Sequence, residues 1–208
     1  MNEKTSVEKV FKDRFDNKAW GKGESISGSG SSLAKTRRIA NELPKVLAHF
    51  QIRSLLDIPC GDFHWFRTVD LTGVDYIGAD IVPDLICHNK QYERPGVRFD
   101  TLDILTSQLP SVDLIFTRDC LVHLSNEQIV TALRNIKRSG AKWFMATTFP
   151  GCEVNHNISP GAWRRINMEE KPFNLPVPDR YIFEYCTELE NRCRDKSLGL
   201  WKTESIYI

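Results

Sequence analysis

The sequence predicts an α/β fold in which one domain, residues 1–208, is built around a mostly parallel sheet. Strand-like apolar runs alternate with helical patterns through the middle of the chain, which is typical of βαβ units. The 208 residues are enough for one domain with a buried core. Hydrophobic residues make up 41% and charged residues 26%, the proportions of an ordinary globular protein.

The N-terminal part, residues 1–32, is expected to hold a helix around residues 6–17 and a Gly/Ser-rich stretch over residues 21–32. Such a composition usually means a flexible linker. Because Trp20 stands at its root, the stretch is equally consistent with a lid that is mobile without ligand and closes over a bound one. The sequence leaves both interpretations open.

Residues 33–150 carry the predicted sheet. An amphipathic helix is predicted over residues 33–50, and strands are predicted at 54–58, 75–79, 97–102, 112–117 and 142–147. Between the last two strands, apolar residues at 129, 130, 133 and 136 predict a helix over residues 125–139. Ser125 is the expected N-cap of this helix, and Gly140 lies beyond its end.

The C-terminal part has two patterns. Residues 150–180 contain five prolines and no clean period, which predicts a long irregular segment over the sheet. Because such loops often carry function, residues 151–180 are assigned to binding of an acceptor substrate. Residues 181–208 return to strand-like patterns at 181–186 and 198–208, which predicts a closing antiparallel pair.

Composition argues against several kinds of partner and location. A net charge of +1 gives no general attraction to nucleic acid or to an anionic membrane. The six cysteines include no C-x-x-C pair, and the His and Asp residues lack metal-ligand spacing, so neither a metal site nor a disulfide framework is expected. No signal peptide and no 18-residue apolar stretch is found, so we expect a cytoplasmic protein without membrane insertion.

Acidic residues end three successive predicted strands. Asp57, Asp80 and Asp103 lie at the carboxyl ends of strands that should meet at one edge of the sheet, where open α/β folds bind their ligands. A carboxylate after the second strand can accept hydrogen bonds from both hydroxyls of a ribose. The turn after the first strand contains only Gly61, whereas a dinucleotide-binding turn would show G-x-G-x-x-G. The pattern therefore predicts an adenosine-type ligand without a bound pyrophosphate, which argues against a nicotinamide oxidoreductase.

With these motifs, residues 56–62, 78–81, 103–104 and 113–119 resemble the class I S-adenosylmethionine-dependent methyltransferases. The resemblance covers roughly residues 33–150. It implies a Rossmann-like fold with a mostly parallel seven-stranded sheet, helices on both faces, and S-adenosylmethionine as cofactor. It assigns the turn after the first strand to the methionine part, the acid after the second strand to the ribose and that after the third to the adenine. Cofactor contacts are thereby assigned to Trp20, Ser27, Asp57, Cys60, Gly61, Asp62, Asp80, Ile81, Asp103, Ile104 and Arg118.

More narrowly, residues 20–32, 59–65, 118–123 and 161–167 resemble small methyltransferases associated with glycan synthesis, including the methyltransferase domain of a chlorovirus capsid-glycan enzyme. This resemblance implies an acceptor hydroxyl on a sugar or glycan. The family turn usually has two or three glycines, whereas Pro59 and Asp62 replace small residues here.

His123 and Asp119 are the candidate catalytic residues. His123 follows the fourth strand, and an imidazole with an ordinary pKa of about 6.5 suits a general base; the alternative is a capping or packing histidine. Asp119 could orient that imidazole, act as the base, or pair with Arg118. Trp163 offers a stacking face but could equally belong to the core. Acceptor contacts are assigned to His64, Asn157, Trp163 and Arg164.

The sequence therefore predicts an S-adenosylmethionine-dependent O-methyltransferase that acts on a sugar or glycan hydroxyl. One alternative keeps the chemistry but changes the acceptor to another small metabolite or to a nitrogen. The other is a non-catalytic module that only binds S-adenosylmethionine.

Overall fold

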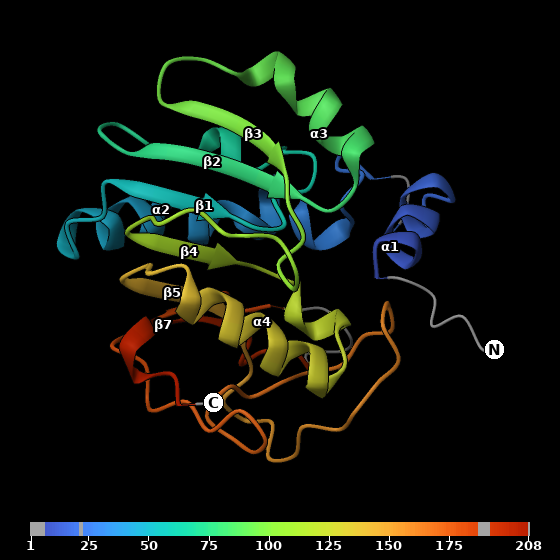
Figure 1. Ribbon diagram of the computed structural model, residues 1–208, viewed down its shortest axis with the longest axis vertical. Coiled ribbons are helices and arrows are strands. Elements are labelled where there is room, and N and C mark those ends of the chain that lie inside the picture. The colour runs from blue at the N-terminus through green and yellow to red at the C-terminus, as the bar shows by residue number, and fades with distance from the viewer. Residues whose placement is uncertain (1–6, 21–22, 187–191, 208) are drawn as a thin grey trace.

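The computed structural model describes residues 7–20, 23–186 and 192–207. They form one seven-stranded sheet with helices packed against it (Figure 1). The order across the sheet is β3-β2-β1-β4-β5-β7-β6. The strands are β1 (Ser54–Asp57), β2 (Asp75–Asp80), β3 (Val97–Thr101), β4 (Leu114–Thr117), β5 (Trp143–Thr148), β6 (Arg180–Phe183) and β7 (Ser197–Lys202).

Strand direction explains which chain ends meet. β1 to β5 pair in parallel, and β7 runs antiparallel to both of its neighbours, β5 and β6. The predicted mostly parallel sheet with a closing antiparallel pair is confirmed. Because β6 points the same way as β5, the carboxyl ends of β1 to β6 and the amino end of β7 all lie along one edge of the sheet.

Helices cover both faces, as predicted. Helix α2 (Leu33–His49) packs on one face, and α4 (Asn126–Arg138) packs on the other (Figure 1). Helix α1 (Val7–Asp16) lies beyond the carboxyl ends of the strands, and α3 (Pro83–Asn89) follows β2 (Figure 1). The two core clusters on the faces of the sheet therefore leave its carboxyl edge open to a ligand.

The ends of α4 are set by its predicted signals. The Ser125 hydroxyl accepts from the backbone N–H of Gln128, and the Gln128 side chain accepts from the Ser125 N–H, which forms a capping box. Gly140 follows the helix with a positive φ of 77°. This helix begins and ends where the sequence predicted.

The two C-terminal strands are shorter than predicted. β6 ends at Phe183 because Tyr185, at a φ of 52°, is in the left-handed region and cannot continue a strand. β7 ends at Lys202, since the chain then turns through a 3-10 helix at Thr203–Ser205. The first two residues of the predicted Gly/Ser-rich stretch and residues 187–191 of the closing part lie outside the described residues.

The segment between β5 and β6 has no regular structure, as its prolines predicted. Asn155 holds it together: the side-chain amide donates to the carbonyls of Asn167 and Lys171, and its oxygen accepts from the Asn167 N–H. Ile166, Met168 and Phe173 bury their side chains in the core on the α4 face. In the described part of the chain, no helix has the length and apolar character needed to cross a membrane.

Candidate active site

A pocket with about 1020 Å³ of empty space, part of it open to solvent, lies at the carboxyl ends of β1, β2 and β4. The strand order reverses between β1 and β4, since β1 has β2 on one side and β4 on the other. Open α/β sheets bind ligands at such a reversal, because the two connecting segments leave the edge in opposite directions and form a crevice.

The residues that the sequence analysis assigned to a cofactor all line this pocket. They come from the first three strand ends, the turn after β4, the Gly/Ser-rich stretch and Trp20, which precedes that stretch. The set is Trp20, Ser27, Asp57, Cys60, Gly61, Asp62, Asp80, Ile81, Asp103, Ile104 and Arg118.

The turn after β1 is compact and specifically requires glycine. Gly61 has a positive φ of 54°, and its N–H donates to Asp80 Oδ2 at 3.2 Å. The buried amide of Asn89 donates to the Gly61 carbonyl at 2.7 Å. These bonds hold the peptide groups on both sides of Gly61, so the protein's own side chains fix the conformation of the turn.

Asp62 attaches the Gly/Ser-rich stretch to this turn. Its Oδ1 accepts from the hydroxyls of Ser25 and Ser27, at 3.0 and 3.2 Å, and its Oδ2 accepts from the Ile26 N–H at 2.9 Å. The stretch thus lies over the pocket, and the side chains of Ile26 and Ser27 reach its lining. Because both Asp62 oxygens have partners in the stretch, Asp62 holds residues 25–27 against the turn after β1; we call these three residues the latched segment.

Two buried carboxylates form the floor of the pocket. Asp80 accepts from the N–H groups of Gly61 and Val82, and burial raises its pKa to about 6. Asp57 accepts from the Tyr76 hydroxyl at 2.7 Å; burial raises its pKa well above the ordinary value, more than that hydrogen bond lowers it. Additional donors from a ligand would favour the ionised form of either acid.

Asp103 lies at the pocket wall and also shapes its own loop. Its Oδ1 accepts from the Leu105 N–H at 2.8 Å, and its Oδ2 accepts from the Thr106 hydroxyl at 2.7 Å. A carboxylate oxygen can accept more than one hydrogen bond, so these local bonds still leave acceptor capacity. Ile81 and Ile104 supply apolar surface to the same lining.

A second pocket adjoins the first and shares Trp20, Ser27, Ser31 and Asp119 with it. It combines the Gly/Ser-rich stretch with the ends of β4 and β5, the irregular segment after β5 and the start of β7. Its lining is Trp20, Ser27, Gly28, Ser29, Gly30, Ser31, Asp119, His123, Phe149, Trp163, Cys193 and Lys196. The shared residues place Asp119 at the junction of the two pockets.

His123 reaches the second pocket from the 3-10 helix at Leu121–His123. Its Nδ1 lies 2.8 Å from the Ala162 carbonyl oxygen, which can only accept, so the proton resides on Nδ1 and Nε2 is left as an acceptor. Burial lowers the pKa of His123 by more than the Ala162 bond raises it, which favours the neutral imidazole. The group that orients the ring is therefore the Ala162 carbonyl, not Asp119.

Asp119 belongs to a cluster of four charged residues, Arg118, Asp119, Glu184 and Lys196. Lys196 Nζ lies 2.6 Å from Asp119 Oδ2 and 3.4 Å from Glu184 Oε2. Arg118 forms two hydrogen bonds to Glu184 and lies 3.2 Å from Asp119 Oδ2. Burial would raise the pKa of Asp119, but Lys196 and Arg118 outweigh it and hold the pKa well below its usual range.

Glu184 and Lys196 are site residues that the sequence analysis did not identify. Glu184 follows the carboxyl end of β6, and Lys196 precedes the amino end of the antiparallel β7, so both lie at the ligand-binding edge. Lys196 lies just before the strand predicted at 198–208, whereas Glu184 falls inside the strand predicted at 181–186. The observed end of β6 at Phe183 and the direction of β7 were therefore needed to place both residues at this edge.

Three of the predicted acceptor contacts line neither pocket. His64 Nε2 lies 3.6 Å from Glu24, and the Asn157 side chain accepts from the Asn126 N–H at the start of α4. The buried Arg164 guanidinium donates to the carbonyls of Leu121 and His156 and to the Asn126 side chain. The structure thus uses Asn157 and Arg164 to brace the irregular segment against α4, and brings only Trp163 of this set to a pocket.

Within the described ranges, no group of three or more His, Cys, Asp or Glu side chains is placed to hold a metal ion. Burial raises the pKa of Cys60 and of Cys120, that of Cys120 to about 12. These two pocket thiols are therefore uncharged at neutral pH.

Solved methyltransferase structures share this fold. Magnesium protoporphyrin IX methyltransferase from Synechocystis, in a structure with bound S-adenosylmethionine, matches with a TM-score of 0.53 and 14% identity over 76% of this chain and 83% of its own. The same enzyme with S-adenosylhomocysteine matches with a TM-score of 0.53 and 13% identity over 69% of this chain and 72% of its own. The described chain therefore has the Rossmann-like fold of the class I methyltransferases.

Other matches are partial. A protein from Pyrococcus horikoshii is 20% identical over 56% of this chain, with a TM-score of 0.46, and the match spans 58% of its own length, less than two thirds. No family model and no curated protein sequence matches this sequence.

Proposed function

We propose that this protein transfers the methyl group of S-adenosylmethionine to a hydroxyl of a sugar or glycan. The observation that carries the proposal is the junction at Asp119. On one side of Asp119 lies the first pocket, whose acids are placed to bind an adenosine-type ligand. On the other side lies the second pocket, which contains a neutral histidine whose Nε2 can accept a proton.

The chemistry of the first pocket fits S-adenosylmethionine. Asp80 is a buried acid whose ionised form gains from hydroxyl donors, as a ribose diol would supply. Ile81 and Ile104 offer apolar surface for a purine, and Asp103 lies beside them as an acceptor for its amino group. The turn at Gly61 and the acid Asp57 line the part of the pocket proposed for the amino-acid end. When bound, the cofactor supplies an electrophilic methyl group on a sulfonium.

The second pocket supplies the groups that act on the acceptor. Neutral His123 can take the proton of an acceptor hydroxyl at Nε2, while the Ala162 carbonyl holds the ring in place. Asp119 stays ionised and is a weak base, so its role is to accept a hydrogen bond and orient the acceptor. The latched segment, residues 25–27, helps to exclude water from the first pocket. Positioning of this kind supplies much of the rate of a transfer between two bound groups.

The lining of the second pocket suits a sugar. Trp20, Phe149 and Trp163 offer aromatic surface, and the backbone of residues 28–31 and the charged Asp119 and Lys196 offer hydrogen bonds. Carbohydrate rings present both apolar C–H faces and hydroxyl groups, which this mixture can contact. The resemblance to glycan-associated methyltransferases supports the same acceptor class.

A labelling experiment tests the proposal. The purified protein is incubated with S-adenosylmethionine that carries an isotopic methyl label and with panels of glycans, free sugars, small hydroxylated metabolites and amines. We expect label in a sugar or glycan, and loss of that labelling in His123→Ala with cofactor binding retained by calorimetry. Label only in a metabolite or amine would overturn the sugar assignment. Cofactor binding without transfer to any panel would favour the non-catalytic module, and binding of NAD in place of S-adenosylmethionine would overturn both.

A further inference from the structure

Lys196 is one of the most buried charged residues of the site. Its side chain is 6% exposed, and the amine lies between Asp119, at 2.6 Å, and Glu184, at 3.4 Å. Burial and the nearby Arg118 lower the pKa of Lys196, but Asp119 and Glu184 outweigh them and raise it. The amine is therefore protonated at neutral pH and cannot serve as the base.

The charges around Lys196 show which acidic residue its positive charge balances. Arg118 and Glu184 already form a pair with two hydrogen bonds, at 3.2 and 2.7 Å, with side chains 5% and 3% exposed. That pair is neutral without Lys196. Arg118 also donates to the Gly30 carbonyl at 3.0 Å, so its guanidinium serves several acceptors. The charge that Lys196 adds is therefore matched by Asp119.

Asp119 directs only one of its oxygens into the cluster. Oδ2 faces Lys196 and Arg118, whereas Oδ1 lies 3.5 Å from the Thr147 hydroxyl, at the limit of a hydrogen bond. The side chain is 29% exposed and lines both pockets. The residue has a positive φ of 54°, and its N–H donates to Thr147 Oγ1 at 2.9 Å. Oδ1 thus retains acceptor capacity at the junction.

We propose that Lys196 is a positioning residue that fixes Asp119 as an anion, with Oδ1 presented to the acceptor substrate. This inference rests on the proposed function for the identity of the substrate, but not for the ion pair itself. A buried ion pair is weak evidence for a stabilising role, because desolvation offsets the attraction, so a lysine placed here is better explained by what it does to Asp119. A second hydroxyl of the acceptor would donate to Oδ1, while His123 takes the proton of the hydroxyl that receives the methyl group.

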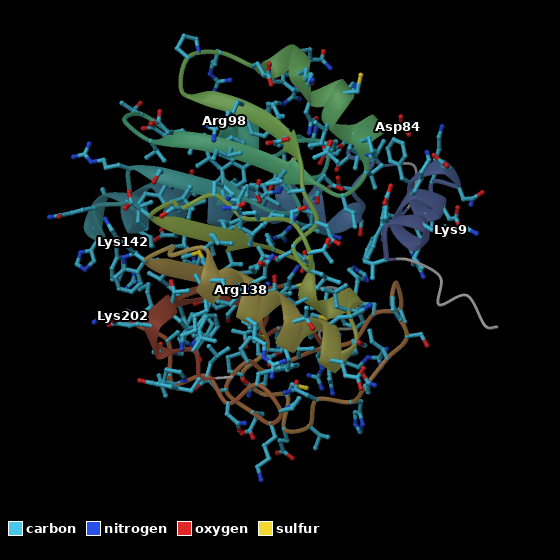
Figure 2. All side chains as sticks on the ribbon, in the orientation of Figure 1. Lys9, Asp84, Arg98, Arg138, Lys142 and Lys202 are labelled. Carbon is cyan, nitrogen blue, oxygen red and sulfur yellow. The ribbon has the colours of Figure 1, made fainter. Side chains whose placement is uncertain are left out.

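The test compares three variants with the wild type. Lys196→Met removes the charge, Lys196→Arg retains it, and Lys142→Met is the matched control. Lys142 Nζ also bonds an aspartate, Asp113, at 2.7 Å, but it is exposed and points outward at the end of the sheet opposite α1 (Figure 2). Should Lys196→Met not fold, Lys196→Gln removes the charge and keeps a hydrogen-bonding group.

The first readout needs neither cofactor nor acceptor. Carboxyl ¹³C shifts of labelled aspartates are followed against pH, with Asp119 assigned by Asp119→Asn. Arg118, which follows β4, and Lys196, which precedes β7, face Asp119 directly. Glu184, which follows β6, acts on it indirectly because it also pairs with Lys196, and His123 faces it from the turn that follows. Loss of an adjacent opposite charge typically moves a carboxyl pKa by about 1 to 3 units. We expect Asp119 in Lys196→Met to titrate at least about one unit higher than in the wild type, with Lys196→Arg and Lys142→Met unchanged; an unshifted titration would overturn the inference.

The second readout separates positioning from general stability. With the acceptor found by labelling, we expect Lys196→Met to raise the KM for that acceptor about tenfold or more, with cofactor Kd unchanged and with recovery in Lys196→Arg. An unchanged KM alongside a shifted Asp119 titration would overturn the role in acceptor binding. Failure of the wild type to bind S-adenosylmethionine would overturn the proposed function instead, and the titration result would stand.

Discussion

The Ser27 hydroxyl lies against the α-carbon of Gly61, so that a Cβ atom built on Gly61 would be only 2.2 Å from Ser27 Oγ. Ser27 Oγ also accepts from the Asp62 N–H at 3.0 Å, which explains the close approach. The latched segment and the turn after β1 therefore fit together only while residue 61 has no side chain.

Gly61→Ala should release this segment and weaken cofactor binding. The left-handed φ of Gly61 costs a non-glycine residue about 1 to 2 kcal/mol. In addition, the new methyl group would clash with Ser27 and displace residues 25–27. The control is Gly73→Ala, which has a φ of 76° but whose Cβ would meet Arg53 at an ordinary 3.5 Å. Both variants should lower the free energy of unfolding, whereas only Gly61→Ala should raise cofactor Kd, by tenfold or more in calorimetry.

Hydrogen exchange gives the companion measurement for that pair. Exchange of residues 25–32 should slow when S-adenosylmethionine is added to the wild type and to Gly73→Ala, and should stay fast in Gly61→Ala. If S-adenosylmethionine leaves the exchange rates of this stretch unchanged in all three proteins, the result would favour the linker interpretation.

Cofactor affinity should fall as pH drops through about 6, because Asp80 must be ionised to accept from two ribose hydroxyls. The sign follows from its raised pKa: binding favours the deprotonated acid, so affinity is full above that pKa and weakens by up to tenfold per pH unit below it. Asp80→Asn should weaken binding by about 1 to 3 kcal/mol at pH 7.5 and remove this pH dependence. Asp100→Asn, at the exposed end of β3, is the control. A flat profile in the wild type would argue against Asp80 as the ribose acid.

His123→Ala should lower turnover by about 100-fold to 10,000-fold with little change in cofactor Kd. Burial lowers the pKa of His123, so the base is neutral at physiological pH, and activity should fall as pH drops below the ordinary histidine value of about 6.5. The exposed His88→Ala is the control. Near-normal turnover of His123→Ala with the true acceptor would refute His123 as the general base.

Trp163→Ala should weaken acceptor binding and spare the cofactor. The indole is 42% exposed, lines the second pocket and contacts Phe149 edge-on, so it is available for stacking and is not a core residue. We expect the acceptor KM to rise about tenfold, corresponding to roughly 1 to 1.5 kcal/mol for one aromatic contact. Tyr207→Ala removes a more exposed aromatic at the far end of α4 and should change neither constant. Equal effects of the two variants on the free energy of unfolding, with an unchanged KM, would refute the stacking role.

The sequence by itself determined the local structure and the first pocket. Apolar runs fixed the five parallel strands, and Ser125 with Gly140 fixed α4, because these signals act within a few residues of the chain. The acids Asp57, Asp80 and Asp103 could be placed at one edge because every parallel strand ends at the same edge. Glycine at position 61 was identified from the same turn.

Only the tertiary structure decided how the remaining polar groups are paired. Arg164 and Asn157 read as acceptor contacts in the sequence but brace the start of α4, a contact between residues more than thirty positions apart. Asp119 pairs with Lys196, 77 residues away, and the ring of His123 is held by the Ala162 carbonyl, 39 residues away. Pairing at such separations depends on the strand order, in which β7 lies between β5 and β6, and no local pattern encodes that order. Short-range signals therefore fixed where the site lies, and long-range packing fixed which charges face each other within it.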